Sequence, residues 1–468
     1  MGETLRLTLG WVAEAVGGDI QSGDRDEAIG DVVIDTRTLQ AGDFFVALRG
    51  LRFDAHEFVA EAFQKGSGGA IVERGFASAS SPTRGSVVEV DDTTTALQDL
   101  AHAVRRASGT RVVAITGSAG KTTTKEAIAE CLSGRFRVVR NEGNLNNHIG
   151  LPLSLLQLRQ CPDVAVMELG MNHPGEISAL VAIAEPDTRV WTNVGDAHIG
   201  FFESPDAIAD AKAEILERAT AADVLVCNAD DRRVMARAGA FVGRTLTFGI
   251  SDPATVRAHD VESLGIDGMR ARMVTPVGER QVVTPLIGHG NLANVLAAAA
   301  VALDFGTPLD DIADTAARLT ATDRRGTVRR LRGETVLIDD SYNSSPSALA
   351  AALDIVAAES GAFRKVAVLG EMLELGEHSL ALHRRSGTQA AAAGIGLLFA
   401  IGGEPVRALA AAAVEAGMPA AAVRYVENSE AAARDVAAAV RPGDLVLVKG
   451  SHGIRTDIVA DRVAAEFA

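Results

Sequence analysis

The amino-acid sequence predicts an α/β protein built from three domains. The chain has 468 residues, too many for one ordinary hydrophobic core, and the usual domain size suggests about three units. Short apolar runs alternate with helical segments along the chain, as in the βαβ units of a mostly parallel sheet. This alternation starts afresh near residue 323. We therefore expect domains at 1–108, 109–322 and 323–468.

The first of these segments predicts a small N-terminal α/β domain. Its β-like runs, at 31–36, 43–48 and 69–74, are separated by Gly and Asp turns. A helical period over 93–108 leads into Ser-Gly-Thr, which predicts a helix and then a linker.

The second and third segments each predict a sheet of mostly parallel strands. The central strands are expected at 111–116, 163–169, 188–194 and 223–228. The C-terminal strands, between Ala-rich helices, are expected at 335–340, 365–370, 397–402 and 444–450. The C-terminal pattern predicts a Rossmann-like, doubly wound domain. Because such sheets bind ligands beyond the carboxyl ends of their strands, functional residues are expected there.

Charge and composition exclude several classes of protein. The net charge of -16 is the opposite of what a nucleic-acid binder needs to neutralise phosphates. No apolar run approaches the roughly 20 residues that span a bilayer, and the first residues lack a signal peptide's apolar core. Cys131, Cys161 and Cys227 are too widely spaced for a disulfide framework or zinc site. We expect a cytoplasmic protein with no nucleic-acid partner and no membrane insertion.

A phosphate-binding loop is predicted where the first central strand ends. In RVVAITGSAGKTTTKEAI (111–128) an apolar strand is followed by a Gly-rich turn and a helix. The glycines let backbone N–H groups approach phosphates, Lys121 can neutralise them, and Thr122 can offer a hydroxyl to Mg²⁺. Ile115 stands where the strict Walker A pattern has Gly, so the loop is a shortened variant that predicts a central P-loop-type ATPase domain. The expected ATP contacts of the loop are Gly117, Ser118, Ala119, Gly120, Lys121, Thr122 and Thr123.

Lysine is scarce in this Arg-rich chain, which favours a specific role for Lys121. We expect Lys125, further along the same helix, to tolerate substitution. The loop alone indicates only a protein that uses a nucleotide. A kinase, a GTPase and a nucleotide-dependent scaffold remain open on this evidence.

Several further blocks resemble the Mur ligase family, in the family's order and over essentially the whole chain. The loop resembles the family's GTxGKT signature, with Ser118 in place of Thr. The other blocks are NEGNLNNHIGLPLSLL (141–156), MELGMNHPGEI (167–177), TNVGDAHIGFFES (192–204), AKAEI (211–215) and GHGNLANVLAAAA (288–300). The resemblance implies an ATP-dependent ligase that joins a carboxylate to an amine.

Three residues are candidates for holding Mg²⁺ together with Thr122. Glu168 ends an apolar strand, where a carboxylate is costly to bury but suits a hard cation. His198 follows the next strand, and Lys212 lies in a helical segment; from the residues alone each could be a core or solvated side chain. The resemblance implies that both support the metal, with Lys212 carbamylated and therefore anionic. The catalytic set implied is Lys121, Glu168, His198 and Lys212.

The resemblance also implies nucleotide contacts outside the loop. Asn294 would contact adenine, whereas Asn291 could equally orient its helix. The family's third-domain arginine corresponds to Arg325, but Arg324 precedes it where Gly is usual, so the choice between the two stays open. LIDDSYNSSPSAL (337–349) resembles the DDSYNANP block, in which Asp340 would contact the ribose, beside Asp339.

Other segments resemble the members that add D-alanyl-D-alanine to UDP-N-acetylmuramoyl-tripeptide. These are DSYNSSP, VLGEMLELGEHS (368–379) and LVKGSHG (447–453), the last with His452 where Arg is usual. The DNPR block of the ligase that adds the third amino acid is absent from the sequence. Residues 35–58 resemble a uridine-nucleotide-binding region, so residues 1–108 would bind the UDP-sugar-peptide. The substrate contacts implied are Thr36, Arg37, Arg49, Asp54, His56, Asn146, Asn147, Tyr342, Asn343, Lys449 and Ser451.

The resemblance implies a reaction in two steps. The tripeptide carboxylate attacks the γ-phosphate of ATP to give an acyl phosphate and ADP, and the amine of the dipeptide then displaces phosphate. ATP and Mg²⁺ are the expected cofactors, and a monomer is the expected state.

Overall fold

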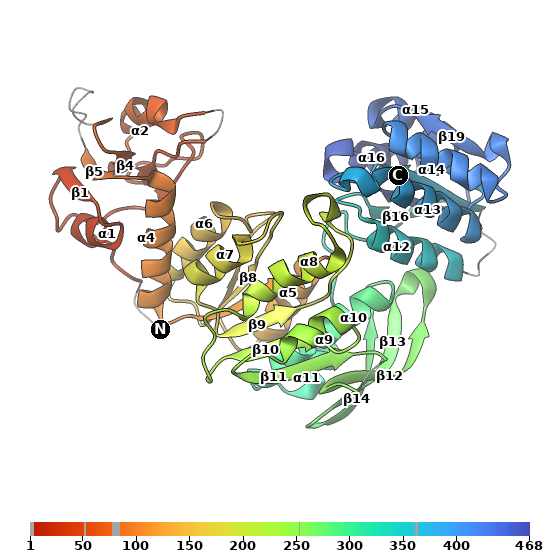
Figure 1. Cartoon of the computed structure of the whole chain (residues 1–468), viewed down its shortest axis with the longest axis horizontal. Coiled ribbons are helices and arrows are strands. Elements are labelled where there is room, and N and C mark those ends of the chain that lie inside the picture. The colour runs from red at the N-terminus through yellow and green to blue at the C-terminus, as the bar shows by residue number, and fades with distance from the viewer. Residues whose placement is uncertain (1–3, 51–52, 77–84, 252, 360, 362–363) are drawn as a thin grey trace.

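The computed structural model describes residues 4–50, 53–76, 85–251, 253–359, 361 and 364–468. The strands of these residues form three sheets, most of whose pairings are parallel, and helices pack on them. Figure 1 shows the N-terminal and C-terminal sheets at opposite ends of the molecule, with the central sheet between them. The predicted α/β class is confirmed. The domain boundaries after residues 108 and 322 stay predictions.

The N-terminal sheet has the strand order β1-β5-β4-β3-β2. Helices α1 and α4 cover one face, and α2 covers the other, because successive strand side chains enter two separate cores. The elements are β1 (Asp19–Ser22), β2 (Val32–Val33), β3 (Phe44–Val46), β4 (Gly69–Glu73), β5 (Ser86–Val90), α1 (Leu9–Ala15), α2 (Val59–Gln64) and α4 (Thr93–Ser108).

The central sheet has the order β14-β13-β12-β11-β10-β9-β6-β8-β7. Helices α5 and α10 pack on one face, whereas α4, α6, α7 and α8 pack on the other. The strands are β6 (Arg111–Thr116), β7 (Val138–Arg140), β8 (Val164–Glu168), β9 (Thr188–Trp191), β10 (Val224–Asn228), β11 (Arg244–Gly249), β12 (Val256–Ser263), β13 (Met269–Thr275) and β14 (Gly278–Thr284). The helices are α5 (Lys121–Ser133), α6 (Gly150–Leu156), α7 (Glu176–Ala184), α8 (Pro205–Ala213), α9 (Arg232–Ala238), α10 (His289–Asp304) and α11 (Leu309–Ala316).

The C-terminal sheet has the order β15-β16-β20-β17-β18-β19 and is doubly wound. Helices α12, α13 and α14 pack on one face, and α15 and α16 pack on the other. The elements are β15 (Thr327–Arg330), β16 (Val336–Asp340), β17 (Arg364–Gly370), β18 (Leu397–Ile401), β19 (Val423–Val426), β20 (Asp444–Lys449), α12 (Pro346–Ala358), α13 (Ser379–Ala392), α14 (Glu404–Glu415), α15 (Ser429–Ala439) and α16 (Asp457–Glu466).

Helix α4 connects the N-terminal and central regions through packing as well as through the chain. Its apolar face, which includes Leu97 and Leu100, belongs to the same core as Phe44 of the N-terminal sheet and Leu151 of α6. Its C-cap is Gly109 in the left-handed conformation, after which β6 begins. A shared core of this kind restricts how the two regions can move against each other.

The antiparallel strands β12, β13 and β14 extend the parallel central sheet. The sequence patterns did not predict them, because only alternate residues, such as Met269, Ala271 and Met273, are buried. None of the helices in the described ranges combines the length and the apolar character required to cross a membrane.

Candidate active site

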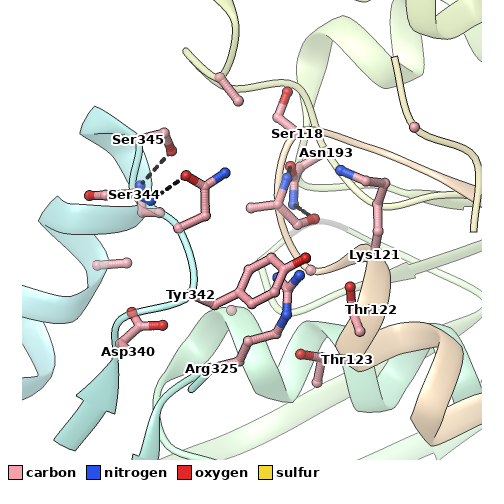
Figure 2. A pocket seen from close by; sticks show the side chains of 18 of the residues that line it. Ser118, Lys121, Thr122, Thr123, Asn193, Arg325, Asp340, Tyr342, Ser344 and Ser345 are labelled. Atoms are coloured by element: carbon pink, nitrogen blue, oxygen red, sulfur yellow. Dashed lines mark hydrogen bonds between the residues drawn. The ribbon is translucent and has the colours of Figure 1, made fainter. Parts of the chain in front are cut away.

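The predicted nucleotide residues, apart from Gly117, line a cavity of about 1210 Å³ between the central and C-terminal sheets. Figure 2 shows Lys121, Thr122 and Thr123 at the start of α5, facing Asp340, Ser344 and Ser345 across the pocket. The predicted residues that line this cavity are Ser118, Ala119, Gly120, Lys121, Thr122, Thr123, Asn146, Asn147, Glu168, His198, Asn294, Arg325, Asp340, Tyr342, Asn343, Lys449 and Ser451.

The phosphate loop depends on two glycines that allow close approach. A Cβ atom on Gly117 would lie 1.9 Å from Thr192 Oγ1, and one on Gly120 would lie 2.3 Å from Asn294 Oδ1. Both glycines have positive φ, 152° and 81°, a region that side chains disfavour. Larger residues would therefore displace the loop as well as strain it.

The turn after β9 supports the loop from behind. Asn193 Nδ2 donates to Ala119 O at 3.0 Å, and Ala119 N donates to Asn193 Oδ1 at 2.9 Å. Thr192 Oγ1 donates to the same carbonyl at 2.7 Å. Neither residue was predicted as a site residue, although both lie in the block at 192–204. Paired side-chain and backbone bonds to one loop residue are the kind of contact that preorganises a phosphate site.

The Lys121 side chain is hydrogen-bonded to the loop that precedes it. Its Nζ donates to Gly117 O at 2.8 Å. Burial lowers the pKa of Lys121, and the charge of Arg325 lowers it further, whereas the carboxylate of Glu168 opposes both. A phosphate group in the cavity would supply the missing negative charge and favour the ammonium form.

Glu168 ends β8 and is 3 % exposed. Its Oε2 accepts a hydrogen bond from Thr122 Oγ1 at 2.7 Å, and its Oε1 accepts one from Asn146 Nδ2 at 2.8 Å. Both hydrogen bonds come from neutral donors, and the nearby counter-charge is the ammonium of Lys121, whose charged form the Glu168 carboxylate favours. The oxygens of Glu168 and Thr122 are hard ligands of the type Mg²⁺ prefers, so these two side chains fit the predicted ion.

His198 lines the same cavity, but its side chain contacts Glu374 of the C-terminal region. Its backbone is left-handed, with φ of 63°, and its Nδ1 donates to Glu374 Oε2 at 2.5 Å. This bond lowers the pKa of Glu374. Glu374, which lies in the C-terminal block at 368–379, was not predicted as a site residue. The described residues contain no group of three or more His, Cys, Asp or Glu side chains placed to hold a metal.

Lys212 is 2 % exposed on α8. Burial lowers its pKa well below the ordinary value, and the charge of Lys121 lowers it further. Within the described part of the chain, no hydrogen bond or ion pair engages its amine, and the residue does not line the cavity. A neutral amine without a partner is the form that reacts with carbon dioxide.

The two arginines that the sequence left as alternatives have different contacts in the structure. Arg324 pairs with Asp461 at 2.9 Å and Asp457 at 3.2 Å, both on α16. Arg325 lines the cavity, with its guanidinium carbon 4.0 Å from the centroid of the Tyr342 ring. Figure 2 shows the two side chains next to each other. Of the two arginines, Arg325 is thus the one that lines the cavity, whereas Arg324 is held by ion pairs with α16.

Asn294 and Asn291 lie one turn apart on α10. Asn294 Nδ2 donates to Asn291 Oδ1 at 3.2 Å, and Asn291 Nδ2 donates to Ile287 O at 2.9 Å. The Asn291 amide thus bonds to the turn before the helix and orients Asn294. Both residues line the cavity.

The loops after β16 and β20 are joined by a buried lysine. Lys449, 3 % exposed, lies 2.6 Å from Asp340 Oδ2 and donates to Asn343 O at 3.0 Å. Ser451 Oγ accepts from Leu373 N at 2.9 Å. Asp339 is fully buried, and burial raises its pKa. Lys449 and Ser451 thus have partners within the protein.

Two further cavity residues have structural partners. Asn147 Oδ1 accepts from Gly150 N at 2.8 Å, at the start of α6. The Tyr342 ring is tilted by 39° from that of His452, with ring centroids 5.7 Å apart. His452 is the residue that departs from the family's arginine, and it too lines the cavity.

The predicted N-terminal contacts do not line this cavity, and each has a partner in its own region. Arg49 pairs with Asp54 and Glu73, and His56 Nδ1 donates to Asp54 Oδ1 at 2.6 Å. Thr36 Oγ1 donates to Glu61 at 3.1 Å, and Arg37 pairs with Asp35 at 2.6 Å. Residues 51–52 of the segment that contains them lie outside the described residues.

Comparison with known proteins assigns the family. Residues 115–302 match the Mur ligase middle domain, and residues 324–452 match the Mur ligase, glutamate ligase domain. The UDP-N-acetylmuramoyl-tripeptide--D-alanyl-D-alanine ligase of Bacillus subtilis is 33% identical over 475 residues, which cover 99% of this chain and 100% of that protein.

Solved structures agree with this match. Crystal structure I of MurF from Acinetobacter baumannii has a TM-score of 0.89 and 30% identity, covering 99% of this chain and 100% of that one. MurF from Thermotoga maritima in complex with ADP has a TM-score of 0.80 and 29% identity, covering 93% of this chain and 97% of that one. With this identity over nearly the full length, and with the phosphate loop facing the C-terminal domain across one cavity, the chain belongs to the Mur ligase family.

Proposed function

We propose that this chain is the ATP-dependent ligase that adds D-alanyl-D-alanine to UDP-N-acetylmuramoyl-tripeptide, as its relatives' names state for them. One observation carries the proposal: Lys121 of the phosphate loop and Arg325 and Asp340 of the C-terminal domain line the same cavity. A nucleotide held between two domains can be enclosed when they close. Enclosure would protect an acyl phosphate from water until an amine arrives.

The residues divide the proposed chemistry between positioning and charge neutralisation. Lys121 and the backbone N–H groups after Gly117 would hold the transferring phosphate, and Arg325 would add positive charge from the opposite side. The tripeptide carboxylate would attack the γ-phosphorus atom and form an acyl phosphate while ADP leaves. The dipeptide amine would then attack the acyl carbon, phosphate would leave, and the amine would lose a proton.

Mg²⁺ is the proposed metal, held by Thr122 and Glu168. The ion would neutralise charge on the phosphate oxygens during transfer. The position of the buried Glu168 carboxylate, which lines the cavity and bonds to the Thr122 hydroxyl, supports this assignment. We also propose that Lys212 acts as a carbamate and that His198 joins the metal side after it exchanges its bond to Glu374.

We propose that Asp340 contacts the ribose and that Asn294 contacts adenine. Lys449 and Ser451 then shape the site from within rather than contacting the dipeptide, because their polar atoms already bond to the protein. The N-terminal residues Arg37 and Arg49 remain proposed contacts of the uridine nucleotide. We further propose a cytoplasmic monomer.

Two measurements test the reaction. ATP breakdown should require both the UDP-tripeptide and D-alanyl-D-alanine; breakdown with either alone at the full rate would indicate a phosphatase or kinase instead. Oxygen-18 placed in the tripeptide's terminal carboxylate should appear in the released phosphate. Unlabelled phosphate would exclude the acyl phosphate, because water or another group would then have attacked ATP.

A further inference from the structure

Lys125 lies one turn after the phosphate loop, and the proposed mechanism gives it no task. The residue is 1 % exposed, an unfavourable place for an ammonium group because burial removes its hydration. Its Nζ donates to Asn141 O at 2.5 Å and lies 3.1 Å from Glu126 Oε1. The expectation that Lys125 would tolerate substitution does not fit these contacts.

Asn141 connects this lysine to the metal side of the cavity. Asn141 follows β7 and is 1 % exposed. Its Oδ1 accepts from Glu168 N at 2.9 Å, and its Nδ2 donates to Glu168 O at 3.2 Å. Strands β7 and β8 are parallel neighbours, so their carboxyl ends lie at the same edge of the sheet. The Asn141 side chain therefore fixes the backbone at the end of β8, where Glu168 stands.

Helix α5 is connected to Glu168 by two sets of hydrogen bonds. Thr122 and Lys125 are three residues apart, which places them on the same face of the helix. Thr122 Oγ1 bonds directly to the Glu168 carboxylate, and Lys125 bonds to Asn141, which bonds to the Glu168 backbone. Helix α5 thus fixes both the side chain and the backbone of Glu168, the residue proposed to bind the cation.

We infer that Lys125 is a positioning residue for the metal site: it holds Asn141, and through Asn141 it keeps the Glu168 carboxylate beside Thr122. This inference rests on the metal role of Glu168 in the proposed function. Outer partners that orient a metal ligand commonly contribute about 10- to 100-fold in metal affinity.

The alternative role for Lys125 is charge balance alone. Its ion pair with Glu126 distinguishes this role from positioning. Glu126 neutralises Lys125 but also lies 2.9 Å from Arg140 Nε, so it has a second cationic partner. If charge balance were the whole role, Glu126 would be as important as Asn141. If positioning is the role, the bond to the Asn141 carbonyl matters and Glu126 does not.

The test compares Lys125→Met with Lys365→Met in the full-length chain. Lys365 Nζ also donates to a backbone carbonyl, Ala357 O at 3.0 Å, but Lys365 lies on β17 and, among the described residues, makes no bond to Asn141 or Glu168. Isothermal titration calorimetry would measure ADP affinity in MgCl₂ and in EDTA. We expect Lys125→Met to reduce the strengthening of ADP binding by Mg²⁺ by about tenfold. Its affinity in EDTA, and both affinities of Lys365→Met, should stay at the wild-type values.

A second variant covers the case in which Lys125→Met does not fold. Asn141→Asp keeps an acceptor for Glu168 N but loses the donor to Glu168 O, and it should show the same selective loss. Glu126→Gln keeps the Lys125–Asn141 bond and should retain the wild-type Mg²⁺ effect. An equal loss in Glu126→Gln, or an equal loss of affinity in EDTA and MgCl₂ for Lys125→Met, would overturn the inference.

The wild-type titration distinguishes this inference from the proposed function. ADP binding that is the same with and without Mg²⁺ in the wild-type chain would contradict the metal role of Glu168 itself. A wild-type Mg²⁺ effect that a folded Lys125→Met retains in full would contradict the role of Lys125 alone.

Discussion

The interdomain cavity and the N-terminal candidate region place their predicted residues in different ways. In the cavity, Lys121, Glu168 and Asp340 come from distant parts of the sequence and line one space. In the N-terminal region, Arg49, Asp54 and His56 form a connected set of contacts with Glu73. The cavity residues also have protein partners, but they border open space that a ligand can fill. Their convergence on that space from distant parts of the sequence is what indicates ligand binding.

The lysines show the same contrast. Lys121 and Lys449 line the cavity, whereas Lys125, on the same helix as Lys121, and Lys212, whose pKa the charge of Lys121 lowers, do not line it. Lys125, Lys212 and Lys449 are 1 %, 2 % and 3 % exposed. The Lys65 side chain, in the N-terminal region, is 43% exposed and pairs with Glu61. Buried lysines are rare because the charged form loses its hydration. Their occurrence in and next to the phosphate-binding region therefore points to chemistry there.

The largest effect is expected at Lys121. Lys121→Ala should reduce kcat by about 10²- to 10³-fold, because the ammonium would neutralise charge that develops on the transferring phosphate. Thermal unfolding should show an intact fold, because the side chain fills no apolar core. Lys365→Ala is the matched control and should be tolerated. A loss of only a few-fold in Lys121→Ala would contradict the assignment of the phosphate loop.

The second-largest loss of activity is expected at Lys212. The pattern of activity among its variants identifies the chemical form of the side chain. As a carbamate it would supply anionic oxygens, so Lys212→Ala should be nearly inactive and partly rescued by acetate or formate. Lys212→Arg should be inactive and not rescued, since a guanidinium does not form this carbamate and would bring a positive charge to the metal side. Steady-state rates with and without the small carboxylates measure this. Near-normal turnover of Lys212→Arg would show that the residue is only a cation.

The sequence predicted most of the fold because buried parallel strands are continuous apolar runs. The run at 111–116 matches β6, and the helical period at 93–108 matches α4. The antiparallel strands β12 to β14 were not predicted, because alternating buried and exposed residues give a weaker signal than a continuous apolar run. The extent to which α4 packs on two regions was also not visible, since periodicity identifies an apolar face but not its partner.

The site was predictable where a motif specifies backbone geometry. Gly117 and Gly120 are required by close approach, so the loop could be placed from sequence. The bonds of Asn193 to Ala119 and of His198 to Glu374 could not be placed, because each joins segments whose relation depends on the tertiary fold. For the same reason the sequence alone did not distinguish Arg324 from Arg325. In the structure, Arg324 forms ion pairs with α16.

An intermediate effect is expected on the C-terminal side of the cavity. Asp340→Ala should raise the KM for ATP by about tenfold, the typical effect of losing a hydrogen bond to a charged group. Binding of the UDP-tripeptide should be retained. Lys449→Met should also raise the KM for ATP, because Asp340 would lose the partner that orients it. If Lys449→Met instead raised the KM for D-alanyl-D-alanine alone, Lys449 would be a dipeptide contact after all.

The smallest effect is expected at Arg37, which tests whether the N-terminal pairs also serve a ligand. Its hydrogen bonds lower the pKa of Asp35 from 3.8 to about 2. A depressed folded-state pKa stabilises the fold above the unfolded-state pKa, and this contribution is lost as the pH falls through about 2. Arg37→Ala should therefore return the pKa of Asp35 toward 3.8 in an NMR titration, with little change in stability because the pair is exposed. If Arg37 also contacts the uridine nucleotide, the KM for the UDP-tripeptide should rise by a few-fold, roughly the effect of one exposed charge contact, while kcat is unchanged. An unchanged KM would limit Arg37 to its pairing with Asp35 and keep the N-terminal region distinct from the cavity.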